Sequence, residues 1–322
     1  PDRSIFDNIF TYWGASAKAR ILGEDLAVLF LDFEKAYDRV DWTFLQGTMA
    51  KMGFPEAWIN GTGVTYSLAH SRILLSGTNG DRIPLSRSVR QGCPLAPYLF
   101  LIFAEAMHCF LTDPHNGLKG ISLPLTEQSL LDNEFADDTT IYLQGQEENL
   151  TKTFNALTTF CIASGAQENW NKSKAIWISP NPPPSWSPVE GFAWVHEADH
   201  LILRLPIGVD LPAEAHEAPI LTMLRRKLLH WSSAQLSLAG RVVVANNVLL
   251  ASIWFVASSC MFSRSCLEQL RRLIRNFICS GKDKDKARAK VAWKTLIQPK
   301  SKGGLGLIDP WQQSKALLSK FV

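Results

Sequence analysis

The chain has 322 residues, 46% of them hydrophobic, which suffices for one large or two modest domains and excludes a disordered protein. Its net charge of +3 is unevenly divided, because residues 264–302 carry 12 Lys and Arg against 3 Asp and Glu, which leaves 21 against 27 elsewhere. A basic C-terminal part beside an acidic remainder suits a protein that binds phosphates with one part and cations with the other. For residues 282–290 alone, a solvated loop is an equal alternative.

The six cysteines stand at irregular spacing, without a CxxC pair or a Cys/His zinc pattern. We therefore expect a reduced intracellular protein in which each cysteine is a small buried hydrophobe. No signal peptide or uninterrupted membrane span is recognisable. The nearest candidate for a span, residues 242–262, contains Asn246 and Asn247 and predicts an amphipathic or buried helix. The chain begins at Pro1 without an initiator Met, so we expect it to be a piece of a longer polyprotein.

In chain order, the first strong signal is residues 27–31, a continuous apolar run that predicts a strand buried on both faces and that ends at Asp32. Helical spacing follows over residues 42–52, and Pro55 opens a second helix towards residue 69. Residues 71–75 and 82–85 predict a β-hairpin whose turn contains Asn79-Gly80.

Residues 88–100 form a polar loop containing Gly92, which opens an apolar helix that runs to about residue 111. Free backbone donors and a glycine allow a nucleotide to approach closely. Residues 130–131 and 141–143 predict two short strands around the adjacent carboxylates of Asp137-Asp138, of which at least one projects into a cleft towards a divalent cation. A solvated turn is the alternative for this pair taken alone.

The following elements are a helix over residues 148–163 that is closed by Gly165 and a strand over residues 174–178. The proline-rich residues 181–188 interrupt the pattern. They fit a domain linker or a long loop, and we favour the loop because residues 201–208 again look like a strand, one that would complete the edge of the same sheet. From Ala213 onward the pattern is helical, and a basic tail follows.

If the fold brings Asp32 and Asp137 together, they can bridge two Mg²⁺ ions roughly 3.5 to 4 Å apart, as in enzymes that transfer phosphoryl groups. Residues 31–42, 90–100 and 135–143 resemble, in this order, the three central motifs of reverse transcriptases. The specific likeness is to the enzymes of non-LTR (LINE-type) retrotransposons, especially plant-like ones. Weaker similarity to the same family covers residues 3–9, 169–173, 231, 236–241 and 303–307.

The resemblance implies an α+β fold, the right-hand polymerase palm, with a βαββαβ (RRM- or ferredoxin-like) antiparallel sheet and a helical thumb. The implied segments are a fingers remnant (1–23), the palm (24–210, with fingers-proximal helices and a hairpin at 54–88), the thumb (211–290) and a basic post-thumb segment (291–322). One departure from the family concerns the primer grip, where this chain has Ile202-Leu203-Arg204 in place of a Tyr-Leu-Gly run.

The implied activity is RNA-directed DNA polymerisation, in which dNTPs are added to a primer 3′-hydroxyl as part of a LINE-like polyprotein. The implied cofactor is a pair of Mg²⁺ ions, with Mn²⁺ as an alternative. The implied partners are an RNA template, a DNA primer or target, dNTPs, and the endonuclease and fingers regions of the same polyprotein, without a membrane. A nuclear location with a cytoplasmic ribonucleoprotein stage is also expected from the resemblance.

The family's site residues carry over onto matching positions of this chain. Asp32 and Asp137 are expected as metal ligands, with Asp138 as a weaker third and the Phe33 carbonyl beside them. Tyr37 matches the aromatic gate that excludes a 2′-hydroxyl, and a core aromatic is its alternative. The remaining expected residues are Lys172 beside the departing pyrophosphate, Arg90, Gln91 and Gly92 at the nucleotide and template, and Arg241, Arg271, Arg272 and Arg275 along the nucleic-acid backbone. For Trp231, Trp254 and Trp293 we favour burial over stacking on bases.

Two other functions compete with this interpretation. One is a group II intron-type maturase, which the thumb and the Gly-Gly-Leu-Gly-Leu segment at residues 303–307 disfavour. The other is a catalytically silent RNA-binding remnant, against which the intact carboxylates argue. The family's fingers strands lie upstream of the segment matched by residues 3–9, so we expect the 322-residue chain alone to bind template-primer and Mg²⁺ but to polymerise poorly or not at all.

Overall fold

The computed structural model describes residues 4–123, 129–184, 192–196, 201–202, 205–206, 213–280 and 291–321. The chain divides into two compact units, Pro1–Glu197 and Ala198–Val322. Arg3, Leu203, Arg204 and the alternating charges of residues 282–290, which the sequence singled out, lie outside the described residues.

The first unit is built on an antiparallel four-stranded sheet in the order β10-β1-β9-β8. Its strands are β1 (Leu26–Leu31), β8 (Asp132–Phe135), β9 (Asp138–Gln144) and β10 (Lys174–Ile178). The helix α5 (Ala96–Leu111) follows β1 and precedes β8, and α6 (Glu147–Ser164) connects β9 to β10. This βαββαβ succession confirms the predicted palm.

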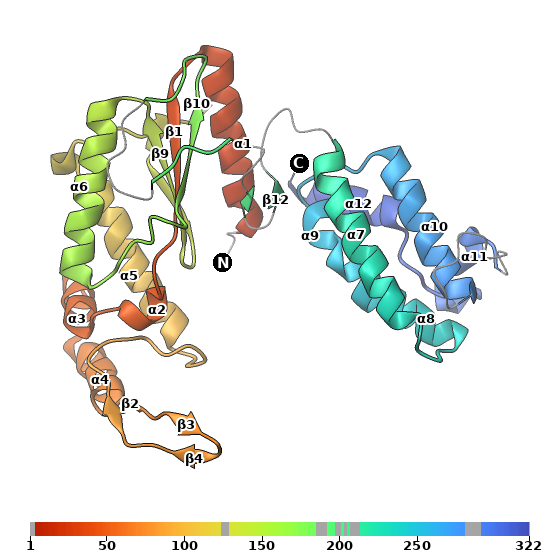
Figure 1. The fold of residues 1–322 in the computed structure, drawn as a ribbon, viewed down its shortest axis with the longest axis horizontal. Helices are drawn as coiled ribbons and strands as arrows, with labels where there is room; N and C mark the ends of the chain where they lie inside the picture. Colours follow the sequence, from red (N-terminus) through yellow and green to blue (C-terminus); the bar gives the residue numbers. More distant parts are fainter. Residues whose placement is uncertain are drawn as a thin grey trace. The chain divides into compact units, whose positions relative to one another are not determined.

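Helices cover both faces of this sheet (Figure 1). Because successive side chains of a strand point to opposite faces, Ala27, Leu29 and Leu31 join the core formed with α5 and α6. On the other face, Phe30 meets the ring of Tyr12 from α1 (Ile5–Leu22), with ring centroids 5.9 Å apart. The central strand β1 is therefore buried on both faces, as the apolar run predicts.

Local signals set the ends of these helices. α1 begins at Ser4 in a capping box with Asp7, and α6 ends at Gly165, whose φ of 78° is left-handed. The predicted helices near residues 42–52 and 55–69 are α3 (Trp42–Lys51) and α4 (Glu56–Ser67).

The predicted hairpin exists, but its turn lies three residues before the predicted Asn79-Gly80. The strand β2 (His70–Ser71) pairs with β5 (Ile83–Pro84), and β3 (Leu74–Leu75) pairs with β4 (Thr78–Asn79). Pairing of Leu75 with Thr78 leaves Ser76 and Gly77 as the two turn residues, with φ values of 48° and 83°. Two positive φ angles are typical of a type I′ hairpin turn, and Asn79 lies in the strand β4, so Asn79-Gly80 is not the turn.

Residues 201–208 do not complete the edge of the four-stranded sheet, contrary to the prediction. The strands β11 (Leu201–Ile202) and β12 (Leu205–Pro206) pair with each other in a separate two-stranded sheet of the second unit. At the outer edge of β10, Ala175 donates its N–H to Ala193 and accepts from Val195. A nearby segment of the first unit thus takes up the hydrogen bonds that an added strand would need.

The second unit is helical. Its elements are α7 (Ala213–Trp231), α8 (Leu238–Val244), η3 (Ala245–Leu249), η4 (Leu250–Ser252), α9 (Trp254–Ala257), α10 (Arg264–Ser280), α11 (Trp293–Ile297) and α12 (Pro310–Leu318). Trp231, Trp254 and Trp293 are partly buried and pack against its apolar core, which agrees only in part with their predicted burial.

Residues 242–262 are several short helical pieces and not one continuous helix. The cause lies at Asn246, in the π-helical turn η3, whose side chain donates to the Gly306 carbonyl at 2.9 Å and accepts from the Ile308 N–H at 3.0 Å. A π-helical turn changes the direction of a side chain in this way and interrupts the regular α-helix only locally. In the described part of the chain, no helix is long and apolar enough to cross a membrane.

The cysteines follow the prediction only in part. All six are free thiols; Cys161, Cys266 and Cys279 are buried, whereas Cys109 is exposed on α5. Burial of each cysteine was therefore too general an expectation.

Candidate active site

Strand register brings the predicted carboxylates to one end of the sheet. The last pair between β1 and β9 is Leu31 with Thr139, so Asp32 and Asp138 follow directly at the same end. Pairing of Phe135 with Asp138 makes Ala136-Asp137 the turn between β8 and β9. Ala136 has a φ of 56°, which such a tight turn requires. Two segments a hundred residues apart in sequence thus present carboxylates side by side.

These carboxylates also influence one another electrostatically. The pKa of Asp138 is raised, first by burial and then by the negative charges of Asp137 and Asp32. Neighbouring carboxylate oxygens are the donor set that Mg²⁺ prefers, and a cation would relieve their repulsion, so the residues fit such an ion. Within the described ranges, no group of three His, Cys, Asp or Glu side chains is already arranged as a metal cage.

The segment around Lys172 is attached to Asp32 through the backbone. The Asp32 N–H donates to Ser173 Oγ at 3.0 Å, and its carbonyl accepts from the Asn169 N–H at 2.8 Å. These bonds place Lys172 Nζ 3.9 Å from Asp32 Oδ2. Both side chains are well exposed, so the pair contributes little to stability. Its importance is positional, because it puts a cation beside the acidic end of the sheet.

Tyr37 lies on α2 (Ala36–Arg39), directly after the Asp32 strand. Its ring stacks on Phe100 of α5, with centroids 4.3 Å apart and planes 10° from parallel. The pKa of Tyr37 is raised by burial and, second, by the charge of Asp137, so the phenol lies near the Ala136-Asp137 turn. Tyr37, Phe100 and Ala136 line a cleft of about 350 Å³. No role was predicted for Phe100 from the sequence, although this residue ends the matched segment 90–100 and lies in the predicted apolar helix.

The loop with Arg90, Gln91 and Gly92 is attached to the same segment. The Val89 N–H donates to the Tyr37 carbonyl at 2.8 Å, just before the loop turns into α5. Gly92 takes a φ of 88°, which favours glycine. All three residues of the loop are exposed, and they are held near Tyr37 by the backbone.

Comparison with known proteins identifies this arrangement. Residues 1–204 match the family described as reverse transcriptase (RNA-dependent DNA polymerase). The chain belongs to the reverse transcriptase family.

Two of its relatives are proteins of mobile elements. The transposon TX1 uncharacterized 149 kDa protein of Xenopus laevis is 27% identical over 88% of this chain and 22% of its own length. The Pol polyprotein of type-1 retrotransposable element R2 of Popillia japonica is 28% identical over 47% of this chain and 21% of its own length. These non-LTR relatives confirm the resemblance, and this reverse transcriptase chain spans about a fifth of their length.

Among solved structures, telomerase of Candida tropicalis in complex with a fragment of telomeric RNA matches 98% of this chain and 49% of its own. The TM-score is 0.44 and the identity 12%, a likeness too distant to bear on function.

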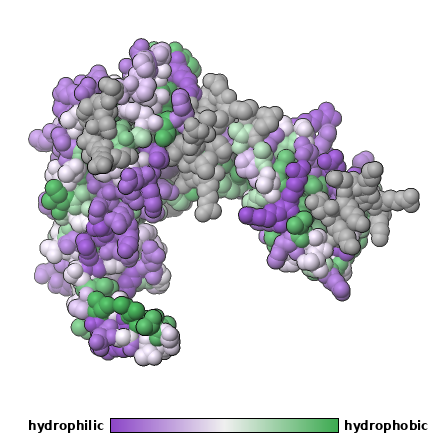
Figure 2. Space-filling model, viewed as in Figure 1, coloured by the Kyte–Doolittle hydropathy of each residue, from purple (hydrophilic) through white to green (hydrophobic). Residues whose placement is uncertain are grey.

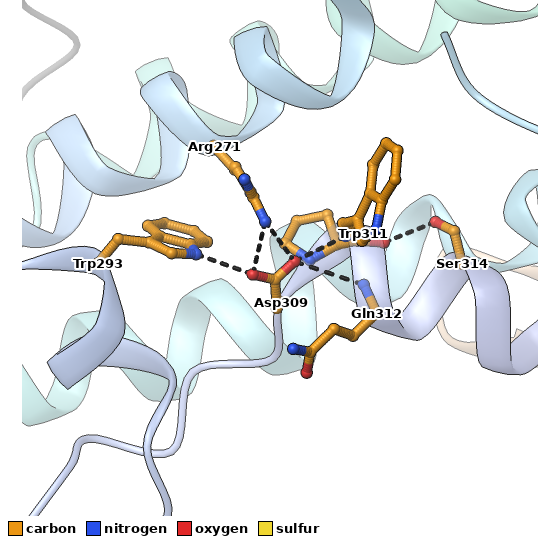
Figure 3. Close-up of polar contacts among 7 residues, drawn as sticks. Arg271, Trp293, Asp309, Trp311, Gln312 and Ser314 are labelled. Atoms are coloured by element: carbon orange, nitrogen blue, oxygen red, sulfur yellow. Dashed lines mark hydrogen bonds and ion pairs between the residues drawn. The ribbon is translucent and has the colours of Figure 1, made fainter. Parts of the chain in front are cut away.

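The predicted nucleic-acid arginines of this reverse transcriptase stand in different environments. Arg271 donates to Asp309 at 2.8 and 3.1 Å and lies over the Trp293 ring, 5.6 Å from its centroid (Figure 3). Arg241 donates to the Ile278 carbonyl at 3.1 Å. These two are held by intramolecular contacts, Arg275 is half-buried, and Arg272 is exposed.

Sequence reasoning missed a second group of basic side chains on the helical unit. Arg225, Arg226 and His230 are exposed on α7, beside Leu229, which is 70% exposed. Helical spacing over the predicted helix from Ala213 could have found Arg226 and His230, because residues three or four apart share one side of a helix.

Proposed function

We propose that this reverse transcriptase chain carries out RNA-directed DNA polymerisation within a retrotransposon polyprotein. The observation that supports it most strongly is the convergence of Asp32, Asp137 and Asp138 at one end of the sheet, within residues 1–204 that match the family. Three carboxylates on this edge have no structural partner that would explain them in the hydrogen bonds and ion pairs of the described residues except the exposed Lys172.

Asp32 and Asp137 are the proposed ligands of two Mg²⁺ ions, with Asp138 as a third ligand and the Phe33 carbonyl close by; Mn²⁺ would serve as an alternative. When bound, such ions lower the pKa of the primer 3′-hydroxyl and stabilise the leaving pyrophosphate. Lys172 supplies positive charge on the same side as Asp32, which suits neutralisation of the departing group.

Tyr37 is proposed to select the sugar. Stacking on Phe100 holds its ring rigidly against the cleft beside Asp137. A fixed ring discriminates against an extra hydroxyl by exclusion, because it cannot move aside at low cost. Arg90, Gln91 and Gly92, attached to the Tyr37 backbone, are placed to contact the nucleotide and the template strand.

The proposed partners are an RNA template, a DNA primer or target, dNTPs, and the endonuclease and fingers regions of the parent polyprotein. The names of the transposon and retrotransposable-element relatives support a polyprotein setting. A nuclear location with a cytoplasmic ribonucleoprotein stage is proposed from the family resemblance alone.

The test is Mg²⁺-dependent incorporation of dNTPs on a poly(rA) template with an oligo(dT) primer. It compares the chain, a longer version that includes the upstream region of the polyprotein, and Asp137→Asn in each. Asp113→Asn is the matched control, since Asp113 is an exposed carboxylate on a turn outside the site. We expect incorporation by the longer version, which Asp137→Asn abolishes and the control retains, and little or no incorporation by the chain alone. Absence of incorporation in both versions, with template binding intact, would favour the silent remnant.

A further inference from the structure

The hairpin between α4 and α5 exposes an unusual amount of apolar surface. We call residues 70–84 the ribbon; it projects from the rest of the first unit beyond α4 (Figure 1). Ile73, Leu74 and Leu75 are 64%, 66% and 74% exposed, and Ile83 is 45% exposed. Figure 2 shows this hydrophobic patch at the end of the unit. No helix covers the ribbon, because every residue from 70 to 84 is exposed.

An exposed apolar hairpin of this kind is unfavourable for a protein unless something binds to it. A two-stranded hairpin is only marginally stable in water, and unpaired apolar strand edges promote aggregation. Contiguous exposed apolar surface on a folded protein marks a place where something binds. The ribbon therefore has a partner, and its charges indicate which kind.

The charges around the ribbon are almost all positive. Residues 68–92 contain four arginines and a single Asp81. All four guanidinium groups are exposed, and none forms an ion pair with a carboxylate of the described residues. Unpaired arginines on an extended element attract phosphates, whereas an apolar protein surface would have no need of them. The arginines are Arg72, Arg82, Arg87 and Arg90.

The ribbon is fixed to the nucleotide side of the palm. Its base is closed by the Leu85 N–H, which donates to the Ala69 carbonyl at 3.0 Å. The returning strand then pairs Arg87 with Asp41, and the Val89 N–H bonds the Tyr37 carbonyl. Backbone hydrogen bonds thus connect the ribbon to Tyr37, which lies beside the carboxylates. A nucleic-acid strand that binds the ribbon therefore has a defined position relative to the site.

We propose that the ribbon is a nucleic-acid wedge. Arg72 and Arg82 bind phosphates, while Leu74 and Leu75 near its tip press against base faces and separate paired strands in the template. Apolar side chains inserted at a base step unstack it, and phosphate contacts on either side hold the opened strands. Use of the wedge during synthesis rests on the proposed function; binding and unstacking by the ribbon do not.

The test uses an RNA hairpin with 2-aminopurine at the base pair next to its single-stranded arm, whose fluorescence rises when the base unstacks. Neither dNTPs nor Mg²⁺ are required. The variants are Leu74→Ser with Leu75→Ser, and Arg72→Gln with Arg82→Gln. Ile162→Ser on α6 is the matched control, because Ile162 is 81% exposed and lies outside the ribbon.

We expect the wild-type chain and the Ile162→Ser control to raise the fluorescence equally. The variant with Leu74→Ser and Leu75→Ser should show little of this rise in fluorescence. The variant with Arg72→Gln and Arg82→Gln should reduce the slope of log affinity against log salt concentration by about 2. Unchanged fluorescence and salt slope in both variants would overturn the wedge. So would a leucine variant that alters only self-association in sedimentation, since that result assigns the ribbon to a protein partner.

The result also stays separate from the polymerase proposal. Ribbon-dependent unstacking, combined with no dNTP incorporation even in the longer version, supports the wedge and contradicts the polymerase. Incorporation that Asp137→Asn abolishes, without ribbon-dependent unstacking, supports the polymerase and contradicts the wedge.

Discussion

Asp309 holds the end of the chain onto the helical unit, and its replacement by alanine should be costly. The buried carboxylate accepts from Arg271, from Trp293 Nε1 at 2.8 Å and from the Trp311 N–H at 2.8 Å at the start of α12 (Figure 3). Asp309→Ala removes a helix cap, leaves an indole N–H without an acceptor and leaves a guanidinium unpaired.

These losses can be added approximately. The cap contributes about 1 kcal/mol, and an unsatisfied buried N–H costs about 1–3 kcal/mol. The Arg271 side chain is 39% exposed, so water takes over part of its interaction and its loss adds only about 1 kcal/mol. The free energy of unfolding of this unit should therefore fall by about 4 kcal/mol.

The assay is equilibrium unfolding in urea, followed by tryptophan fluorescence and circular dichroism. Asp309→Asn keeps a capping oxygen but loses the charge, so its free energy of unfolding should fall between the wild type and Asp309→Ala. Arg271→Ala should also destabilise, whereas Arg272→Ala, its exposed neighbour, should reduce RNA binding with little change in stability. A fall below about 1 kcal/mol for Asp309→Ala would refute the reasoning, because that is the contribution of the cap alone.

Three further predictions concern the first unit. Tyr37→Val should raise the incorporation of rNTPs relative to dNTPs by about tenfold in single-nucleotide assays, since the rigid ring is removed; an unchanged ratio would contradict the gate. Gly145→Ala would place a methyl group 2.4 Å from the Trp177 ring and should lower the free energy of unfolding by about 1–3 kcal/mol, whereas Gly14→Ala, with no atom within 4 Å, should not destabilise. Burial raises the pKa of Tyr66 from 10.0 to about 12, with Cys93 as the next cause. The protonated phenol is thus favoured by folding, its contribution is intact below pH 10.0, and it is lost as the pH rises towards about 12. Stability should then fall less steeply over this range in Tyr66→Phe, and an equal slope would count against the assignment.

Much of the palm could be predicted because its signals are local. The apolar run that ends at Asp32 is too short for a helix and too apolar for a surface, which leaves a central strand. Gly165 stops α6 because the left-handed conformation there suits glycine. The carboxylates could be predicted because an acidic residue at the end of an apolar strand indicates a functional position. In the structure, the register of β1 and β9 brings them to one end of the sheet.

The misplaced elements depend on distant partners. Ser76-Gly77 and Asn79-Gly80 both tolerate positive φ, and only the pairing of Leu75 with Thr78 selects the first. The edge of β10 is occupied by residues 193–195, for which the sequence holds no local signature. Arg271 and Arg272 are adjacent and chemically identical, yet Asp309 binds only the first. Contacts across tens of residues decide such choices, and periodicity carries no information about them.

The central claim is that Asp32, Asp137 and Asp138 form one site for divalent metal ions, and localised cleavage tests it without requiring polymerisation. Fe²⁺ replaces Mg²⁺ in the presence of ascorbate and peroxide, and mass spectrometry maps where the backbone is cut. We predict cuts beside residue 32 and beside residues 137–138, suppressed by excess Mg²⁺ and absent in Asp32→Asn combined with Asp137→Asn. Cuts elsewhere only, or cuts at these positions that persist in the double variant, would contradict a metal site at this end of the sheet.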